Sequence, residues 1–309
     1  MIHRRPLLLR YQRPIPHYKA WSAKARTAVH TVFSTETFVR SIPVATTVKL
    51  YFALVDPYLI FGCEVAINAN EKSLRTYESI QRYYMRRALD LQPRSPVAAL
   101  HVLTGIPPIR HRHVELQLRY AGYAIVQPEN HYENRAYRDA IAMHRRKQRS
   151  WVTDLEKAMK RLPRYPVRLD VELMESEEGT NELRNQVRES CAHYLHDELE
   201  SPRTPLLNPR YLPISPDSYQ SVLVLRKFLR TIRIPAHRVA VVRLLCADHT
   251  LAVEQLRRRR HPDGSRIDTD CRPCRYCGAL TETEVHVLFT CEGPGGGSLR
   301  DRRKMFLDL

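Results

Sequence analysis

The clearest helical pattern in the chain is KSLRTYESIQRYYMRRALDL, which spans residues 72–91. When the segment is wound at about 100° per residue, its apolar side chains fall within an arc of about 80°, the width of a face that packs on a core. These side chains are Tyr77, Ile80, Tyr84, Ala88 and Leu91. Three arginines, Arg75, Arg82 and Arg86, lie within about 40° of one another on the opposite side. We therefore expect a packed helix whose arginine ridge is either a solvated surface or a contact to phosphate.

Proline and glycine mark the ends of further helical segments. A helix over residues 21–39 ends at Ser41-Ile42-Pro43, and Asp56-Pro57 breaks the apolar block 48–65 into two short helices. The pair Ser95-Pro96 predicts an N-cap followed by the first helical residue, and Gly105 predicts the end of that helix.

The same kind of pattern continues towards the C-terminus. Pro108 begins a helix that runs to about residue 126, and helices resume over residues 219–232 and 236–260. The chain has little of the alternating pattern typical of strands. The predicted fold class is therefore mainly α, with a helical lobe followed by a small Cys3His zinc-knuckle unit.

Composition divides the 309 residues into three regions. Residues 1–126 are predicted to be a helical region, and residues 219–309 a helical segment that carries the zinc-binding knuckle at 271–291. Between them, residues 127–218 are first basic, then acidic, and end in a proline-rich linker. The acidic part, 170–200, holds ten acidic residues and two arginines, which predicts an acidic helix or a mobile insert. Its charge is either simply solvated or docks on the basic regions.

The charge balance points to a polyanionic partner. Lysine and arginine number 50 against 33 acidic residues, which gives a formal net charge of +17. Such a balance is typical of proteins that bind RNA or DNA, although a basic surface that only keeps the protein soluble is the alternative. No uncharged apolar stretch approaches the roughly 20 residues of a membrane span, and the leucines after Arg5 are too few for a signal-peptide core. We expect an intracellular, nuclear protein with no membrane partner.

The strongest chemical motif is CRPCRYCGALTETEVHVLFTC, residues 271–291. Four of the seven cysteines lie in this segment, whereas a disulfide scaffold would spread them along a shorter chain. Cys274 and Cys277 have the spacing of a knuckle that offers two thiolates to one ion, and Gly278 suits the tight turn below them. The three scattered cysteines, Cys63, Cys191 and Cys246, are predicted to be buried thiols.

His286 and Cys291 complete the predicted ligand set. Together with Cys274 and Cys277 they form a Cys3His set for one zinc ion, which is structural because four protein ligands leave no position for a catalytic water. On an ideal helix, residues five apart diverge by about 140°, so Cys291 is expected where the helix unwinds. Cys271 with Cys274 is a rival knuckle pair, and a cluster of free thiols is the alternative without metal.

A basic run precedes the knuckle. It consists of Arg257, Arg258, Arg259 and Arg260. These side chains are candidate contacts to nucleic-acid phosphates or a nuclear address, and a solvated helix end is the alternative. Motifs of catalysis are missing: the sequence holds no paired aspartates in a hairpin, no acid-x-Lys triplet, no phosphate loop and no zinc-protease motif. We expect no enzymatic activity.

The segment from LLCADHTLAVEQLRRRR (residues 244–260) to Cys291 resembles the C-terminal zinc-binding region of reverse transcriptases from non-LTR, LINE-type retrotransposons of the fungal type. Those regions share the Cys-x2-Cys pair, a Glu-Thr pair such as Glu282-Thr283, a histidine and a closing cysteine. Residues 18–126 resemble the helical thumb and connector that follow the palm, and Phe61-Gly62-Cys63-Glu64 stands where Tyr-Gly-Cys-Glu is common.

The resemblance implies a thumb-like helical lobe and a zinc knuckle that grip RNA or DNA. In the family, the palm with its metal-binding aspartates lies upstream of the region that this chain resembles, so no catalytic residue can be carried over. We therefore expect a non-catalytic, zinc-stabilised binding protein related to these polymerases. A zinc-stabilised protein-interaction module and a decayed fragment without selected function are the alternatives.

Overall fold

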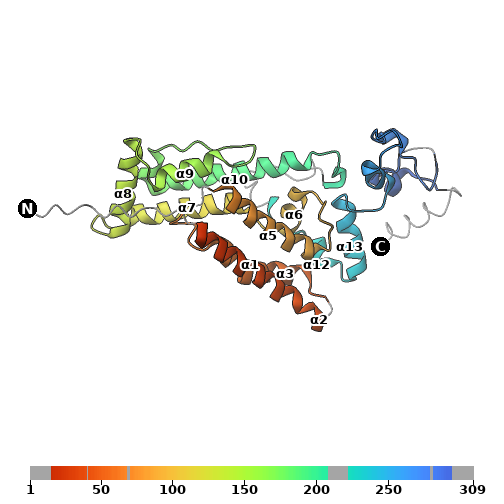
Figure 1. The fold of residues 1–309 in the computed structure, drawn as a ribbon, viewed down its shortest axis with the longest axis horizontal. Helices are drawn as coiled ribbons and strands as arrows, with labels where there is room; N and C mark the ends of the chain where they lie inside the picture. Colours follow the sequence, from red (N-terminus) through yellow and green to blue (C-terminus); the bar gives the residue numbers. More distant parts are fainter. Residues whose placement is uncertain (1–14, 40, 68–69, 208–221, 279–280, 294–309) are drawn as a thin grey trace, which may run out of the picture. The chain divides into compact units, whose positions relative to one another are not determined.

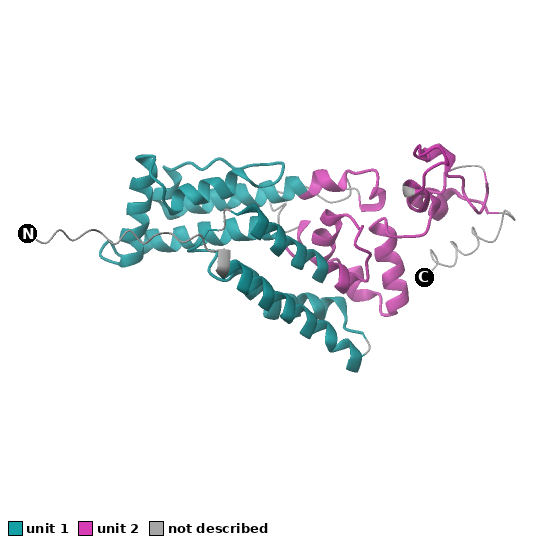
Figure 2. Ribbon diagram, in the orientation of Figure 1, with its two compact units in different colours: residues 1–84, 107–194 teal, residues 85–106, 195–309 magenta. Residues whose placement is uncertain are grey.

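The computed structural model describes residues 15–39, 41–67, 70–207, 222–278 and 281–293, and these are mainly helical (Figure 1). Within these ranges, β-pairing is limited to two isolated antiparallel bridges, Arg260–Arg266 and Pro273–Thr281. The predicted mainly-α class is thus confirmed. The chain divides into two compact units, shown in different colours in Figure 2.

The first unit comprises the described residues of 1–84 and 107–194. Its helical elements are α1 (Ile15–Ser34), α2 (Glu36–Val39), α3 (Val44–Leu50), the π-helical turn η1 (Tyr51–Val55), α4 (Asp56–Ile60), most of α5 (Glu71–Leu89), α7 (Ile109–Val126), α8 (Tyr132–Arg145), α9 (Trp151–Lys160), the 3-10 turn η2 (Leu173–Glu175) and most of α10 (Glu177–Leu199). Helices α7, α8 and α9 pack against one another.

The second unit comprises the described residues of 85–106 and 195–309. Its helical elements are the ends of α5 and α10, then α6 (Val97–Thr104), η3 (Pro205–Leu207), α12 (Phe228–Thr231), α13 (Pro235–Leu245), α14 (Ala252–Gln255), η5 (Leu256–Arg258), η6 (Thr269–Cys271) and the π-helical turn η7 (His286–Thr290). Gly105 ends α6 with a φ of 73°, as its sequence position predicted, and a Cβ there would come within 2.8 Å of Leu225 N.

The core of the first unit runs through the region in which composition predicted an insert. Leu155 and Met159 of α9 and Leu183 and Val187 of α10 are buried in one cluster with α7 and α8. The acidic segment is therefore largely a helix whose apolar face is packed, and the compact units do not follow the boundaries at 126/127 and 218/219 that composition suggested. Residues 208–218 of the predicted linker lie outside the described residues.

Helix α5 carries the packed face that its sequence predicted. Tyr77, Ile80 and Tyr84 are buried, and the Tyr84 hydroxyl donates to the Thr47 carbonyl at 2.6 Å. Gln81 is a buried polar side chain on this helix, and its amide joins three segments. Its nitrogen donates to the Tyr51 hydroxyl at 2.9 Å and to the Pro107 carbonyl at 3.0 Å, while its oxygen accepts from the Ile109 amide at 3.2 Å. These bonds fix where α5 meets the start of α7.

Some predicted helix ends differ from the structure. Asp56-Pro57 does not break the apolar block, because α3 continues through the π-helical turn η1 into α4 and the proline sits in the first turn of α4. Pro96, not Ser95, is the N-cap of α6. The helix predicted over 236–260 is interrupted: α13 ends at Leu245, Ala247 takes a φ of 50°, and α14 and η5 follow only after this turn.

The predictions for the three scattered cysteines, for membrane spans and for a helix over 219–232 can also be compared with the structure. Cys63, Cys191 and Cys246 are all buried, as predicted, and burial raises the pKa of each thiol. No helix among the described residues is long and apolar enough to cross a membrane. In the region where we predicted a helix over 219–232, the described part contains α12, and residues 219–221 lie outside it.

The buried His113 predicts how the stability of the chain depends on pH. Its Nε2 donates to the Leu59 carbonyl at 2.9 Å, and burial lowers its pKa from 6.5 to about 4. The unfolded chain takes up this proton near pH 6.5 and the folded chain only near pH 4. Stability present at pH 7 is therefore lost as the pH falls from about 6.5 to 4, by about 3 kcal/mol over the whole window.

The contribution of His113 to the pH dependence of stability can be measured by urea unfolding of the wild type and of His113→Gln. Unfolding is followed by circular dichroism at pH 7.5 and at pH 4.5. The glutamine amide can still donate to Leu59 but does not titrate. We expect the variant to lose less stability than the wild type between the two pH values. If the wild type and the variant lost the same stability between the two pH values, protonation of His113 would not be the cause of the loss.

Candidate metal centre

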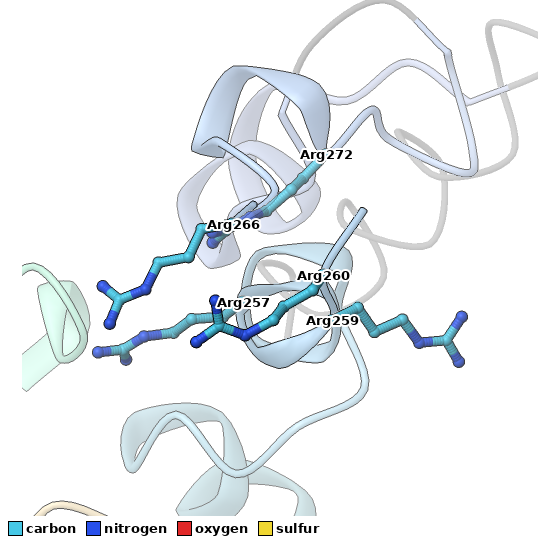
Figure 3. Close-up of a pocket in the computed structure, with 5 residues that line it drawn as sticks. All are labelled: Arg257, Arg259, Arg260, Arg266 and Arg272. Atoms are coloured by element: carbon cyan, nitrogen blue, oxygen red, sulfur yellow. The ribbon is translucent and has the colours of Figure 1, made fainter. Parts of the chain in front are cut away.

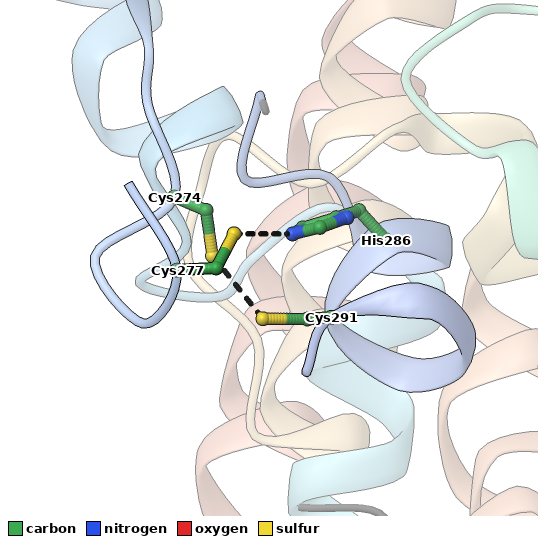
Figure 4. Close-up of side chains that lie close together, drawn as sticks. All are labelled: Cys274, Cys277, His286 and Cys291. Carbon is green, nitrogen blue, oxygen red and sulfur yellow. Dashed lines mark hydrogen bonds between the residues drawn. The ribbon is translucent and has the colours of Figure 1, made fainter. Parts of the chain in front are cut away.

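Three thiols and one imidazole converge near the C-terminal end of the described chain (Figure 4). They belong to Cys274, Cys277, His286 and Cys291, and one ligand atom from each lies within 4.8 Å of the others. Cys274, His286 and Cys291 are buried, whereas Cys277 is half-buried at the edge. These are the four side chains that the motif spacing predicted, and the group could hold one metal ion.

The backbone around Cys274 and Cys277 makes a tight turn, which we call the knuckle. The Gly278 amide donates to the Cys274 carbonyl at 2.7 Å, and Gly278 has a φ of 73°. A side chain at this φ is strained, so glycine allows the turn to close below the sulfurs. The Pro273–Thr281 bridge then closes the loop that carries both cysteines.

The other two side chains come from the π-helical turn η7. The Cys291 amide donates to the His286 carbonyl at 2.7 Å, which closes an i→i+5 turn. Residues five apart diverge on an ideal α-helix, and we expected an unwound helix end for this reason. The structure reaches the same result by widening the turn, which places His286 and Cys291 on one side.

The distances between ligand atoms match a tetrahedral centre. The sulfurs of Cys274 and Cys291 are 3.6 Å apart, and Cys277 Sγ is 3.3 Å from His286 Nε2. Metal–ligand bonds of about 2.3 Å for sulfur and 2.0–2.1 Å for nitrogen at tetrahedral angles place such pairs about 3.8 Å and 3.6 Å apart. A disulfide would need about 2.05 Å. The arrangement therefore fits four ligands around an ion and leaves no open coordination position.

The orientation of His286 is set by its own helical turn. Its Nδ1 lies 3.0 Å from the Thr290 hydroxyl, which itself donates to the His286 carbonyl at 3.2 Å. Because the hydroxyl proton is used in that second bond, we assign the imidazole proton to Nδ1, which then donates to Thr290. Nε2 is left with a lone pair that faces the three sulfurs, the arrangement that a metal-binding histidine requires.

Two buried glutamates brace the segment between the knuckle and η7. Glu282 has no exposed surface, pairs with Arg275 at 2.9 Å and accepts from the Ala252 amide at 3.0 Å. Glu284 lies 2.6 Å from His249 Nε2, and both side chains are almost completely buried. These bonds tie the centre to α14 and to the turn before it.

Sequence reasoning missed the partners of these glutamates, although it noted Glu282 and Glu284 within the motif. Arg275 is seven residues from its partner, and His249 is 35 residues from Glu284, so no local spacing identifies either pair. Glu284, an acidic residue two positions before the ligand His286, is the one signal that could have suggested a support role.

The structure also places the rival cysteine and the candidate arginines. Cys271 is exposed and lies outside the group of four. On α5, Arg75 and Arg82 form i,i+4 ion pairs with Glu71 and Glu78, which also pair with Arg110 of α7. Arg86 instead donates to the side chain and carbonyl of Ser95.

The basic run before the knuckle is described in part. Arg257 donates to Glu254 at 3.1 Å, and Arg260 donates to the Gly264 carbonyl at 2.7 Å. Arg259 is exposed, and the side chain of Arg258 lies outside the described part of the structure. The run therefore stays on the surface of the same unit that holds the candidate metal centre.

Comparison of the chain with protein-family models, curated proteins and solved structures found no match. The chemistry of the centre therefore rests on its own residues and geometry.

Cysteine substitutions test the ligand set. We expect the wild type to retain one zinc ion per chain after dialysis, whereas Cys277→Ser loses most of it, because an alcohol is a much poorer zinc ligand than a thiolate. Cys271→Ser, a matched change at the exposed cysteine, should retain the full amount. Zinc released by acid is measured by a colorimetric chelator, and replacement by Co²⁺ reports tetrahedral thiolate coordination through visible absorption. If Cys271→Ser lost the metal and Cys277→Ser kept it, the ligand set would be wrong.

Proposed function

We propose that the chain binds RNA or DNA without catalysing a reaction, and that one structural zinc ion holds the binding surface together. The zinc ligands in this proposal are Cys274, Cys277, His286 and Cys291. Because these four side chains fill all four positions of a tetrahedral ion, no position is left for an activated water, and the ion has a structural role. The resemblance of residues 244–291 to the zinc-binding region of LINE-type reverse transcriptases supports a nucleic-acid partner and an origin in such a polymerase.

One observation carries the proposal: the candidate metal centre and the basic run belong to one folded segment. The Val253 amide donates to the Glu282 carbonyl at 3.3 Å, and Arg272 donates to the Val253 carbonyl at 2.7 Å. Helix α14 and the following turn η5, which lead into the arginines, are therefore fastened to the knuckle. An ion that orders the knuckle also orders the arginines.

Net charge supports the same partner. A formal charge of +17 attracts a polyanion through release of its counterions, whatever its base sequence. The arginines of α5 are weaker candidates than we expected, because Arg75 and Arg82 already form ion pairs with Glu71 and Glu78. The basic run before the knuckle has fewer acidic neighbours and is the better contact to phosphate.

Salt dependence of binding tests this function. If about five phosphates are neutralised, the logarithm of the association constant should fall against the logarithm of salt concentration with a slope of about −3.5 on single strands and about −4.5 on duplex DNA. Fluorescence anisotropy with labelled oligonucleotides of unrelated sequence measures this slope, and the sequences should differ little in affinity. Cys277→Ser should weaken binding, and Cys271→Ser should not.

The alternatives give different results. A slope near zero, with weak binding at every salt concentration, would contradict nucleic-acid binding and favour a zinc-stabilised protein-interaction module. Nucleotide incorporation on a primed RNA template with Mg²⁺ would contradict the non-catalytic part of the proposal.

A further inference from the structure

Five arginines line one pocket of about 420 Å³ beside the knuckle (Figure 3). They are Arg257, Arg259, Arg260, Arg266 and Arg272. Among the described residues, these arginines form one ion pair with a carboxylate, between Arg257 and Glu254 at 3.1 Å. The pocket therefore concentrates positive charge that neighbouring acidic groups do not balance.

A short hairpin brings two of these arginines together. Arg260 and Arg266 face each other in an antiparallel bridge, and the turn between them is closed by a bond from the His261 amide to the Ser265 carbonyl at 3.0 Å. The carboxylate in this turn, Asp263, accepts from the amide and hydroxyl of Ser265 and so is used within the turn.

The guanidinium groups do not all point the same way. Those of Arg257, Arg260 and Arg266 point to one side of the hairpin, whereas that of Arg259 points to the opposite side (Figure 3). Arg233 and Arg266 are both exposed arginines of the second unit, but only Arg266 is among the residues that line the pocket. This pair offers a matched comparison of two arginines with equal charge.

Arg272 supplies a fixed cation to the same pocket. Only 8% of this residue is exposed, and its terminal nitrogens donate to the Val253 carbonyl at 2.7 Å and the Ile267 carbonyl at 2.8 Å. Its Nε is buried and has no hydrogen-bond partner among the described residues. A buried cation held in this way adds positive charge to the wall of the pocket whatever the exposed arginines do.

These features together suit a phosphate group. Guanidinium groups that share a pocket repel one another unless an anion separates them, and their planar forks match the oxygens of a phosphate. A terminal phosphate carries nearly two charges and three free oxygens, whereas a phosphate inside a strand carries one charge and two free oxygens. A concave site with several converging cations favours the terminal group.

We propose that this pocket binds the terminal phosphate of a nucleic-acid strand. The inference rests on the proposed nucleic-acid binding and adds to it a preference for one kind of strand end. Arg257, Arg260 and Arg266 contact the phosphate with their exposed guanidinium groups, and the buried Arg272 adds positive charge from the knuckle side. Since Arg272 precedes Cys274 by two residues, the metal centre positions one wall of the pocket.

The test compares three oligonucleotides of one sequence, with a 5′-phosphate, with a 3′-phosphate, or with hydroxyls at both ends. Binding to the zinc-loaded full chain is measured by fluorescence anisotropy at one salt concentration. We expect one phosphorylated end to raise the affinity of the wild type about 10-fold, the effect of a charge-assisted contact. Arg266→Ala should lose this gain, Arg233→Ala should keep it, and inorganic phosphate should compete with it in the wild type.

The outcomes separate this inference from the proposed function. Equal affinity for all three oligonucleotides would overturn the terminal-phosphate site and leave nucleic-acid binding intact. An equal loss in Arg233→Ala and Arg266→Ala would also overturn it, since general charge would then explain the effect. If no oligonucleotide bound, the proposed function itself would fail. Circular dichroism and zinc content confirm that both variants are folded.

Discussion

The convergence of three thiols and one imidazole on a single centre is the constraint on which the C-terminal segment depends. Beyond residue 250, the buried apolar residues of the described chain are Ala252 and the two ligands Cys274 and Cys291. The other buried side chains there are Arg272, Glu282, Glu284 and His286, which are polar or charged. A segment with so little apolar burial gains little from the hydrophobic effect, and the metal ion that we propose for the centre would supply the missing stability.

Sequence spacing predicted the candidate ligands because their geometry is local. Cys274 and Cys277 are three residues apart, and the glycine after them fits one kind of turn. The backbone conformation between His286 and Cys291 was harder to predict, since the spacing indicated an irregular helix end but not a π-helical turn. The sequence could predict only part of the pocket next to the centre, because Arg272 is brought to the pocket by the folding of the knuckle.

The fold shows the same division between local and long-range information. The packed face of α5 follows from its periodicity, and Gly105 ends α6 as its position predicted. The balance of charge on α5 could not be predicted, because Arg110 reaches Glu71 and Glu78 from a different helix. For the acidic segment, composition allowed a helix or a mobile insert, and an acidic surface does not reveal that Leu183 and Val187 on the other face of α10 are buried in a core.

Hydrogen exchange with and without a strong chelator tests the central claim most directly, because it reports on each amide separately. If the metal orders the C-terminal segment, chelation should sharply increase exchange at Cys291, Val253 and Gly278, whose amides are hydrogen-bonded in this segment. Amides in the middle of α7, such as that of Leu118, should remain protected. Unchanged protection at Cys291, Val253 and Gly278 after complete removal of the metal would contradict the account.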